Sequence, residues 1–240
     1  MSKYWEVTEY SQPDARQLQQ NAKATVKREK AKGKEMQPVT ISGRKVAASW
    51  WGQAWCENLE RYADFESRLD RGKRYVRTGA VVDLKIQKGK VQARVQGRRK
   101  TPYKIEIRIS PLSEERCQYA IGQCEKRIEN LESLMRGEFP GELKALFVGD
   151  GGLFPSPREI SFNCSCPDWA LMCKHVAAVL YGIGARFDEN PLLFFELRGI
   201  DVEKFVDVAI AGRIDRMLEN ADKPSSRIIP DECLTELFGL

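Results

Sequence analysis

The sequence has little of several features that mark common classes of protein. Among 240 residues there is a single histidine. No apolar run reaches the roughly 18 residues of a membrane-spanning helix, and no amino-terminal apolar stretch is typical of a signal peptide. The Gly-x-x-x-x-Gly-Lys-Ser/Thr loop that binds nucleotide phosphates is also missing. We therefore expect a cytoplasmic protein that does not hydrolyse ATP through such a loop and whose partner is neither a membrane nor a small-molecule substrate.

Cysteine usage separates into two groups. The seven cysteines are an odd number, which fits a reducing compartment better than a disulfide framework. Three of them share a twelve-residue stretch with the only histidine. The other four stand apart on stretches that we expect to be helical: Cys56, Cys117, Cys124 and Cys233. We expect those on helices to be small buried side chains.

The clustered residues are Cys164, Cys166, Cys173 and His175, with the spacing Cys-x-Cys, six residues, then Cys-x-His. Thiolates and imidazoles are the preferred ligands of Zn²⁺, and four of them close a tetrahedral structural site. Residues two apart on a helix are rotated by about 200°, so Cys173 should precede a helix and His175 should lie in its first turn. We expect the first two cysteines to follow a short strand over 159–162. The spacing therefore predicts one structural zinc ion.

Two other readings of these residues are open. The four side chains could simply be buried, or Cys173 and His175 could form a nucleophile–base pair. Burial alone does not explain why three cysteines and the only histidine share one short stretch. A catalytic pair would leave Cys164 and Cys166 without a role. We prefer a metal site, and a structural one, because no ligand position is left for water.

The stretch 158–183 resembles the SWIM-type zinc fingers in the type, order and spacing of its ligands. The run Cys-Lys-His-Val-Ala-Ala-Val-Leu-Tyr that begins at Cys173 is also similar to that family. The surrounding chain is similar to stand-alone bacterial SWIM zinc-finger proteins. The resemblance implies that the protein binds DNA or other proteins, often beside a Snf-type helicase-like ATPase.

Charge is distributed unevenly along the chain. Residues 1–110 contain 25 Lys and Arg against 12 Asp and Glu, whereas residues 111–240 contain 14 against 22. A basic half joined to an acidic half suggests one face for a polyanion and another for a different partner. A polar helix over 14–36 carries much of the basic charge, either as an arm that contacts phosphates or as a solvated, partly frayed helix.

Residues 79–110 show the alternation of an antiparallel sheet with one buried face. Ala80, Val82, Leu84 and Ile86 alternate with polar or outward residues, and two further alternating runs follow, so we expect a three-stranded meander. Its outer face and turns are rich in cations, which suits contacts to phosphates, although a merely solvated face would also carry them. The candidate nucleic-acid-binding residues are Lys85, Lys88, Lys90, Arg94, Arg98, Arg99, Lys100, Lys104 and Arg108.

The remaining segments read mainly as helices. We expect a helix over 49–70 that begins at Ser49 and buries Trp51 and Trp55, a second from 110 or 113 to 135, and short ones over 140–147 and 191–197. A helix over 201–221 and an amphipathic tail complete the chain. The predicted class is α+β: a small antiparallel meander packed with helices, a ββα-like zinc-knuckle module and a helical carboxy-terminal region. The four expected ranges are a basic arm (1–48), an α+β domain (49–150), the zinc finger (151–190) and the helical region with its tail (191–240).

Three functions are compatible with these features. The first is a zinc-binding accessory protein that binds DNA, or RNA, largely through phosphates and works with a helicase-like ATPase. The second is a protein-interaction adaptor without direct DNA contact. The third is a metal-dependent nuclease built on Asp83 and Lys85, which lacks an evident second acidic residue. Because the sole histidine is assigned to zinc and no catalytic set is apparent, we do not expect an enzyme.

Overall fold

The centre of the fold is a four-stranded antiparallel sheet in the order β1-β2-β3-β4. The computed structural model describes residues 13–61, 66–124, 131–138, 141–149, 151–168 and 170–202. The strands are β1 (Val81–Gln87), β2 (Lys90–Val95), β3 (Tyr103–Ile109) and β4 (Ile160–Cys164). The predicted α+β class and the meander are confirmed. The fourth strand comes from the expected finger and pairs with β3, so this pairing crosses the boundary between two of the expected ranges.

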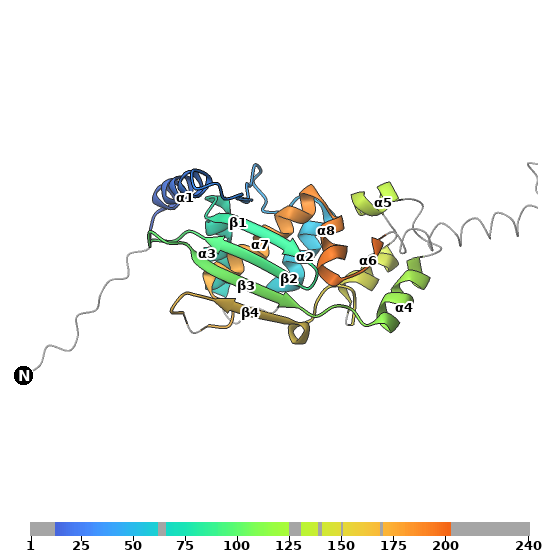
Figure 1. The fold of residues 1–240 in the computed structure, drawn as a ribbon. Helices are drawn as coiled ribbons and strands as arrows, with labels where there is room; N and C mark the ends of the chain where they lie inside the picture. Colours follow the sequence, from blue (N-terminus) through green and yellow to red (C-terminus); the bar gives the residue numbers. More distant parts are fainter. Residues whose placement is uncertain are drawn as a thin grey trace, which may run out of the picture.

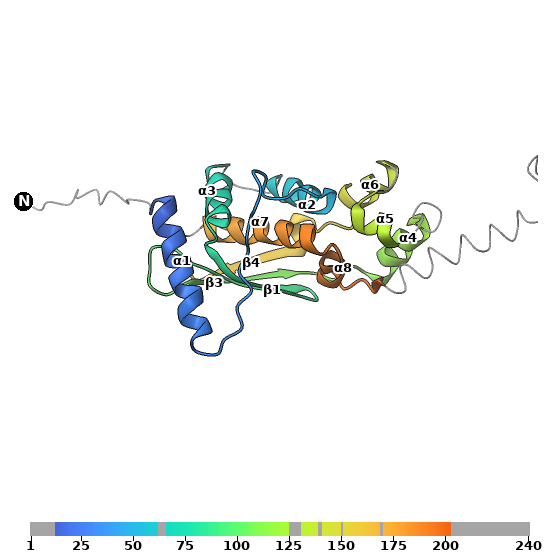
Figure 2. The same ribbon diagram turned by 90° about the horizontal axis from the view of Figure 1, so that it is seen from above.

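Helices cover one face of this sheet in two layers (Figures 1 and 2). Next to the sheet lies α7 (Lys174–Glu189), and outside it pack α2 (Trp50–Glu60) and α3 (Glu66–Arg77). The helix α1 (Ala15–Lys30) contacts β1 and α3, whereas α8 (Leu192–Arg198) contacts β1 and α7. Beyond α8 lie α4 (Glu114–Cys124), α5 (Leu131–Arg136) and α6 (Gly141–Val148). The short 3₁₀ helix η1 (Pro157–Glu159) leads into β4.

The central position of α7 follows from its sequence. Its residues from His175 to Ala185 are all buried, and a helix that is apolar on every side must be enclosed by other elements. Small residues let its neighbours approach closely. A methyl group added at Gly72 of α3 would lie 2.6 Å from Cβ of Ala177, and one at Gly184 would lie 2.7 Å from Sγ of Cys56. The three helices therefore pack through glycine contacts.

Tryptophans of α2 fill the core, as predicted. Trp51 and Trp55 are fully buried, and their indole N–H groups donate to the carbonyls of Leu134 and Leu180 at 2.9 Å each. The side chain of Ser49 caps the helix by accepting from the N–H of Gly52. These rings serve packing and are not available for stacking on nucleobases.

The expected single helix over 49–70 is wrong. The chain forms α2 up to Glu60 and a separate α3 from Glu66. Both helices pack on α7. Phe65, which falls within the expected helix, lies outside the described residues.

Another correction concerns the first strand. A bulge between Val81 and Asp83 breaks the strict alternation, so Val82 does not share the core face with Leu84. A bulge shifts the side chains that follow it to the opposite face. Val82 packs instead with Ala22 and Met36 in a small cluster beneath α1.

Several other predicted helices lie close to their expected positions. The polar helix over 14–36 ends at Lys30, and α4 and α5 fall within the helix expected up to 135, of which residues 125–130 lie outside the described ranges. Gly137, with φ of 68°, ends α5 as predicted. The short helices expected over 140–147 and 191–197 are present as α6 and α8. Nearly all of the predicted helix over 201–221, and the whole tail, lie outside the described residues. Within the described ranges, no helix is both long and apolar enough to cross a membrane.

A buried charge network joins α8, η1 and α4. Arg198 is fully buried and donates to the carboxylate of Glu159 at 2.8 Å and to the carbonyl of Ser110 at 2.7 Å. Arg116 donates to the same carboxylate at 3.0 Å. Burial alone would raise the pKa of Glu159, but hydrogen bonds from Arg198 and from the N–H of Ser156 outweigh this effect and lower the pKa to about 2.

We expect Glu159→Gln to reduce the free energy of unfolding by about 2–3 kcal/mol at pH 7, because it leaves the buried Arg198 without its counter-charge. The folded pKa lies below the unfolded value of about 4.3, so this contribution is present above about pH 5 and is lost as the pH falls toward 2. Urea unfolding of both proteins between pH 7 and pH 3 measures it. Glu35→Gln is the control, because this carboxylate is exposed and forms no ion pair with another described residue. An equal loss for the two variants would contradict the assignment.

Candidate metal centre and basic surfaces

The four predicted ligands converge at the junction of β4 and α7. Cys164 ends β4, Cys166 lies in the turn that follows, Cys173 is the N-cap of α7 and His175 is in its first turn. Their donor atoms all lie within 4.8 Å of one another. Nδ1 of His175 is 4.0 Å from Sγ of Cys164 and 3.9 Å from Sγ of Cys173. The edge of a tetrahedron with Zn–S bonds of about 2.3 Å is about 3.8 Å, so the arrangement fits zinc.

Aromatic rings fix the orientation of the imidazole. Tyr103 of β3 stacks on His175 with centroids 4.2 Å apart, and Tyr75 of α3 meets the ring edge-on at 5.4 Å. Gly97 leaves room for this stack, since a methyl group there would lie 2.8 Å from the Tyr103 ring. Cys173 and His175 are 1% and 2% exposed, so half of the ligand set is shielded from water.

The electrostatics of the thiols also favour a cation. The Cys164 thiol donates to Cys173 and, with His175, lowers the pKa of Cys173 to about 4 against the opposing effect of burial. The pKa of Cys164 is raised by the same interaction and by burial, and burial raises that of Cys166. The cluster therefore stabilises one thiolate, that of Cys173. All three cysteines can be thiolates together only if a divalent ion offsets their charge. Three soft thiolates with one imidazole form a donor set that suits zinc.

The finger loop is tied to the rest of the fold on both sides. Asp168 forms an ion pair with Arg68 of α3 and accepts from the N–H of Ala170 at 3.3 Å. Ser165 donates its N–H to the carbonyl of Lys104 at 3.0 Å, and its hydroxyl accepts from the Lys104 N–H at 2.9 Å. The finger is consequently continuous with the sheet. The expected ββα-like arrangement consists of β3, β4 and α7.

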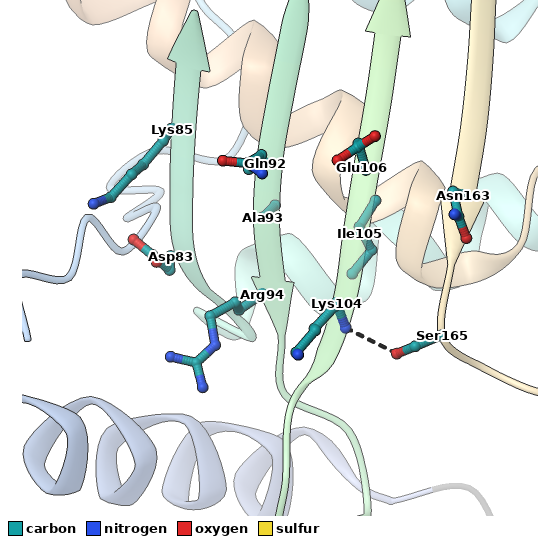
Figure 3. A pocket seen from close by; sticks show the side chains of 10 residues that line it. All are labelled: Asp83, Lys85, Gln92, Ala93, Arg94, Lys104, Ile105, Glu106, Asn163 and Ser165. Atoms are coloured by element: carbon teal, nitrogen blue, oxygen red, sulfur yellow. Dashed lines mark hydrogen bonds between the residues drawn. The ribbon is translucent and has the colours of Figure 1, made fainter.

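The sheet face that turns away from α7 is open and polar. Lys85, Arg94 and Lys104 line a groove of about 550 Å³ on it, together with Asp83 and Glu106 (Figure 3). The lining is completed by three polar and two apolar residues: Gln92, Asn163 and Ser165, and Ala93 and Ile105. Lys90 and Arg108 belong to the outward positions of the same strands. Among the other predicted cations, Lys88 lies in the β1–β2 turn, and Arg98, Arg99 and Lys100 lie exposed in the β2–β3 loop.

Carboxylates neutralise part of this surface. Glu106 pairs with Lys90 at 2.9 Å and with Arg108 at 2.7 Å. Glu29 of α1 pairs with Arg94 at 3.3 Å, and hydrogen bonds from Lys34 and Arg94 lower the pKa of Glu29 to about 2. Within the described ranges, no carboxylate pairs with the other six predicted cations, which are Lys85, Lys88, Arg98, Arg99, Lys100 and Lys104.

A second group of cations was not predicted as a binding surface. Arg68 and Arg71 of α3 and Lys174 of α7 line a cavity beside His175. Arg68 falls within the helix expected over 49–70, Arg71 follows directly after it, and Lys174 lies between the expected ligands Cys173 and His175. Spacing along the chain gives no sign that α3 and the finger meet.

Asp83 has a structural partner. Its carboxylate accepts from the N–H of Gln37 at 3.0 Å. In the part of the chain that the structure describes, the cysteine–histidine cluster is the one group of three or more Cys, His, Asp or Glu whose donor atoms could share an ion. The geometry around Asp83 therefore provides no support for the nuclease reading.

Comparisons with known proteins agree with the site. The SWIM zinc finger family matches residues 162–182, which include all four ligands. The Mycobacterium tuberculosis protein described as "Uncharacterized protein Rv2102" is 34% identical over 197 residues, which cover 81% of this chain and 71% of that protein. No solved structure matches the chain.

We expect Cys173→Ser to lose bound zinc and to lower the melting temperature sharply, because structural zinc contributes on the order of 10 kcal/mol to folding of small modules. Metal analysis and thermal unfolding measure the two effects. Cys56→Ser is the matched control: burial raises the pKa of that thiol to about 12, and it lies outside the cluster. Full zinc occupancy in Cys173→Ser would contradict the ligand assignment.

Proposed function

This chain belongs to the SWIM zinc-finger family, and from that premise we propose that it is a zinc-stabilised accessory protein that binds nucleic acid, DNA in particular, through backbone phosphates. The observation that carries the proposal is the open sheet face with the turn and the loop that adjoin it. Six cations there lack carboxylate partners among the described residues: Lys85 and Lys104 on the face, Lys88 in the β1–β2 turn, and Arg98, Arg99 and Lys100 in the β2–β3 loop. Phosphate contacts of this kind position a protein on nucleic acid without reading its sequence.

The role of zinc in this proposal is structural. Cys164, Cys166, Cys173 and His175 would hold one ion, and their four donors complete a tetrahedral shell. The bound ion would supply cross-linking and charge compensation for the thiolates. Since no position in that shell remains for water or substrate, we propose a binding protein and not an enzyme.

The loop that presents Arg98, Arg99 and Lys100 is held in place by α1. The Thr25 hydroxyl donates to the side-chain carbonyl of Gln96 at 2.8 Å, and Arg28 donates to the carbonyl of Lys100 at 3.3 Å. A loop that is ordered before binding loses less conformational entropy when it contacts a phosphate.

The composition of the groove favours a duplex over a single strand. Proteins that bind single strands without sequence preference usually stack bases on aromatic side chains. The residues that line this groove are three cations, two carboxylates, amides, Ser165, Ala93 and Ile105, and none of them has an aromatic ring. Such a surface can donate hydrogen bonds to phosphates and has nothing on which a base would stack.

A groove beside α1 favours a second function, docking of a protein partner such as a helicase-like ATPase. Its floor contains Ala22, Val26, Val39 and Ile41. Its rim carries cations from α1 and the end of α3: Lys23, Lys27, Lys30 and Arg77. An apolar floor with a basic rim complements an amphipathic helix with acidic flanks. We propose that the adaptor role uses this groove.

We expect binding to a DNA duplex to weaken with salt at a slope of about −5 in log K against log[salt], if about six phosphates are contacted. Lys85→Gln with Lys104→Gln should reduce the magnitude of the slope by about 2 and weaken binding uniformly across sequences. Fluorescence anisotropy over a salt series measures both effects. Lys45→Gln with Arg158→Gln removes the same charge from exposed positions away from the groove and is the control.

Binding that is independent of salt, or a slope that the groove variant leaves unchanged, would contradict the phosphate proposal. The adaptor function is separable by Lys23→Glu with Lys27→Glu, two exposed changes on the rim beside α1. This variant should abolish co-purification of an ATPase partner. Retained capture would contradict docking at this groove.

A further inference from the structure

A cavity of about 320 Å³ lies beside the metal centre, between α3, the finger loop and the start of α7. Arg68 and Arg71 enter it from α3, and Lys174 enters from α7. The other lining residues are Tyr103, Cys166, Pro167, Asp168 and His175. Two helices that are distant in the sequence, α3 and α7, thus place three cations around one cavity.

The side chains that line this cavity carry a net positive charge. The carboxylate of Asp168 forms an ion pair with Arg68. Within the described ranges, neither Arg71 nor Lys174 pairs with a carboxylate. In the sheet groove, by comparison, Arg94 is paired with Glu29, whereas Lys85 and Lys104 have no carboxylate partner among the described residues.

The three cations carry more positive charge than is needed to offset the negative charge of the metal centre. Three thiolates and one neutral imidazole around Zn²⁺ carry a formal charge of −1. With Asp168 the local negative charge is −2, against +3 from Arg68, Arg71 and Lys174. One positive charge remains, in a hollow where a polyatomic anion has room.

The surroundings extend this positive region toward the open face. Tyr103 lines the cavity, and the guanidinium of Arg99 lies over the same ring at 5.5 Å from its centroid. Arg99 is one of the exposed cations of the β2–β3 loop. A strand that contacts this loop can therefore place a phosphate in or at the mouth of the cavity.

We propose that this cavity is a phosphate-binding site in which Arg71 and Lys174 hold one phosphate group beside the zinc finger. Arg71 offers a planar fork of donors and Lys174 a compact positive charge, which together suit a phosphate. Identifying that phosphate as part of a nucleic-acid backbone rests on the proposed function. The site then anchors the strand at the finger, at one end of the sheet groove.

The first test uses inorganic phosphate and the zinc-loaded full chain. Titration at constant ionic strength, followed by ¹H–¹⁵N spectra, should give saturable shifts at the amides of Arg71 and Lys174. Arg71→Gln with Lys174→Gln should weaken this binding about tenfold or more, whereas Lys45→Gln with Arg158→Gln should leave it unchanged. The absence of saturable shifts in the unmodified protein overturns the site, whatever the result with nucleic acid.

The second test uses the DNA duplex and the same two variants. The cavity variant should reduce the magnitude of the salt slope by about 2 relative to the control variant. If inorganic phosphate binds but no duplex does, the site stands and the nucleic-acid function fails. If the duplex binds and the cavity variant keeps the slope of the control, the backbone phosphate is not held there.

Zinc content and melting temperature show whether Arg71 and Lys174 bind phosphate or only offset the negative charge of the metal centre. Both should be the same in the cavity variant and in the control variant, because Arg68 and Asp168 are left intact. Loss of zinc with unchanged phosphate shifts would show that Arg71 and Lys174 only support the metal centre, and would overturn the proposal.

Discussion

The convergence of three thiols and one imidazole on a single point is the constraint on which the rest of this structure depends. Two of the ligands belong to the end of β4 and two to the start of α7. That helix lies between the sheet and the layer formed by α2 and α3. Apolar packing is not directional and would allow α7 to shift along the sheet. A zinc ion held by these four side chains, with its fixed bond lengths, would define the position of α7 and through it that of the outer helices.

The finger is part of the sheet and not an appendage to it. β4 extends the meander, and Ser165 is hydrogen-bonded to Lys104, one of the cations that line the open groove. Metal binding is therefore coupled through a few covalent and hydrogen bonds to the geometry of the basic surface. Such coupling is consistent with an accessory protein whose binding face must be rigid, because a fixed array of cations meets a regular array of phosphates at a smaller entropic cost.

The basic residues fall into two groups, those that form ion pairs with carboxylates and those that have no such partner among the described residues. Glu29 and Glu106 hold Lys90, Arg94 and Arg108 in ion pairs, which orient those side chains but reduce their attraction for an anion. The cations of the β2–β3 loop, and Arg71 and Lys174 in the cavity beside His175, have no such partner among the described residues, whereas Arg68 pairs with Asp168. The two unpaired groups meet at Tyr103. The finger end of the molecule therefore carries positive charge that no described carboxylate neutralises.

Local patterns in the sequence were sufficient for the four ligands, the Cys173 cap and the alternation of the meander. Each of these features depends on residues that are close together in the sequence or on a short repeat. The spacing of residues along the chain is therefore enough to predict them. Only the tertiary structure decided that β4 joins β3, that α2 and α3 are separate, that a bulge turns Val82 toward α1, and that Glu29 neutralises Arg94. It also decided that Arg71 and Lys174 share a cavity. These features join segments far apart in the chain, and which of them meet depends on the packing of the whole core.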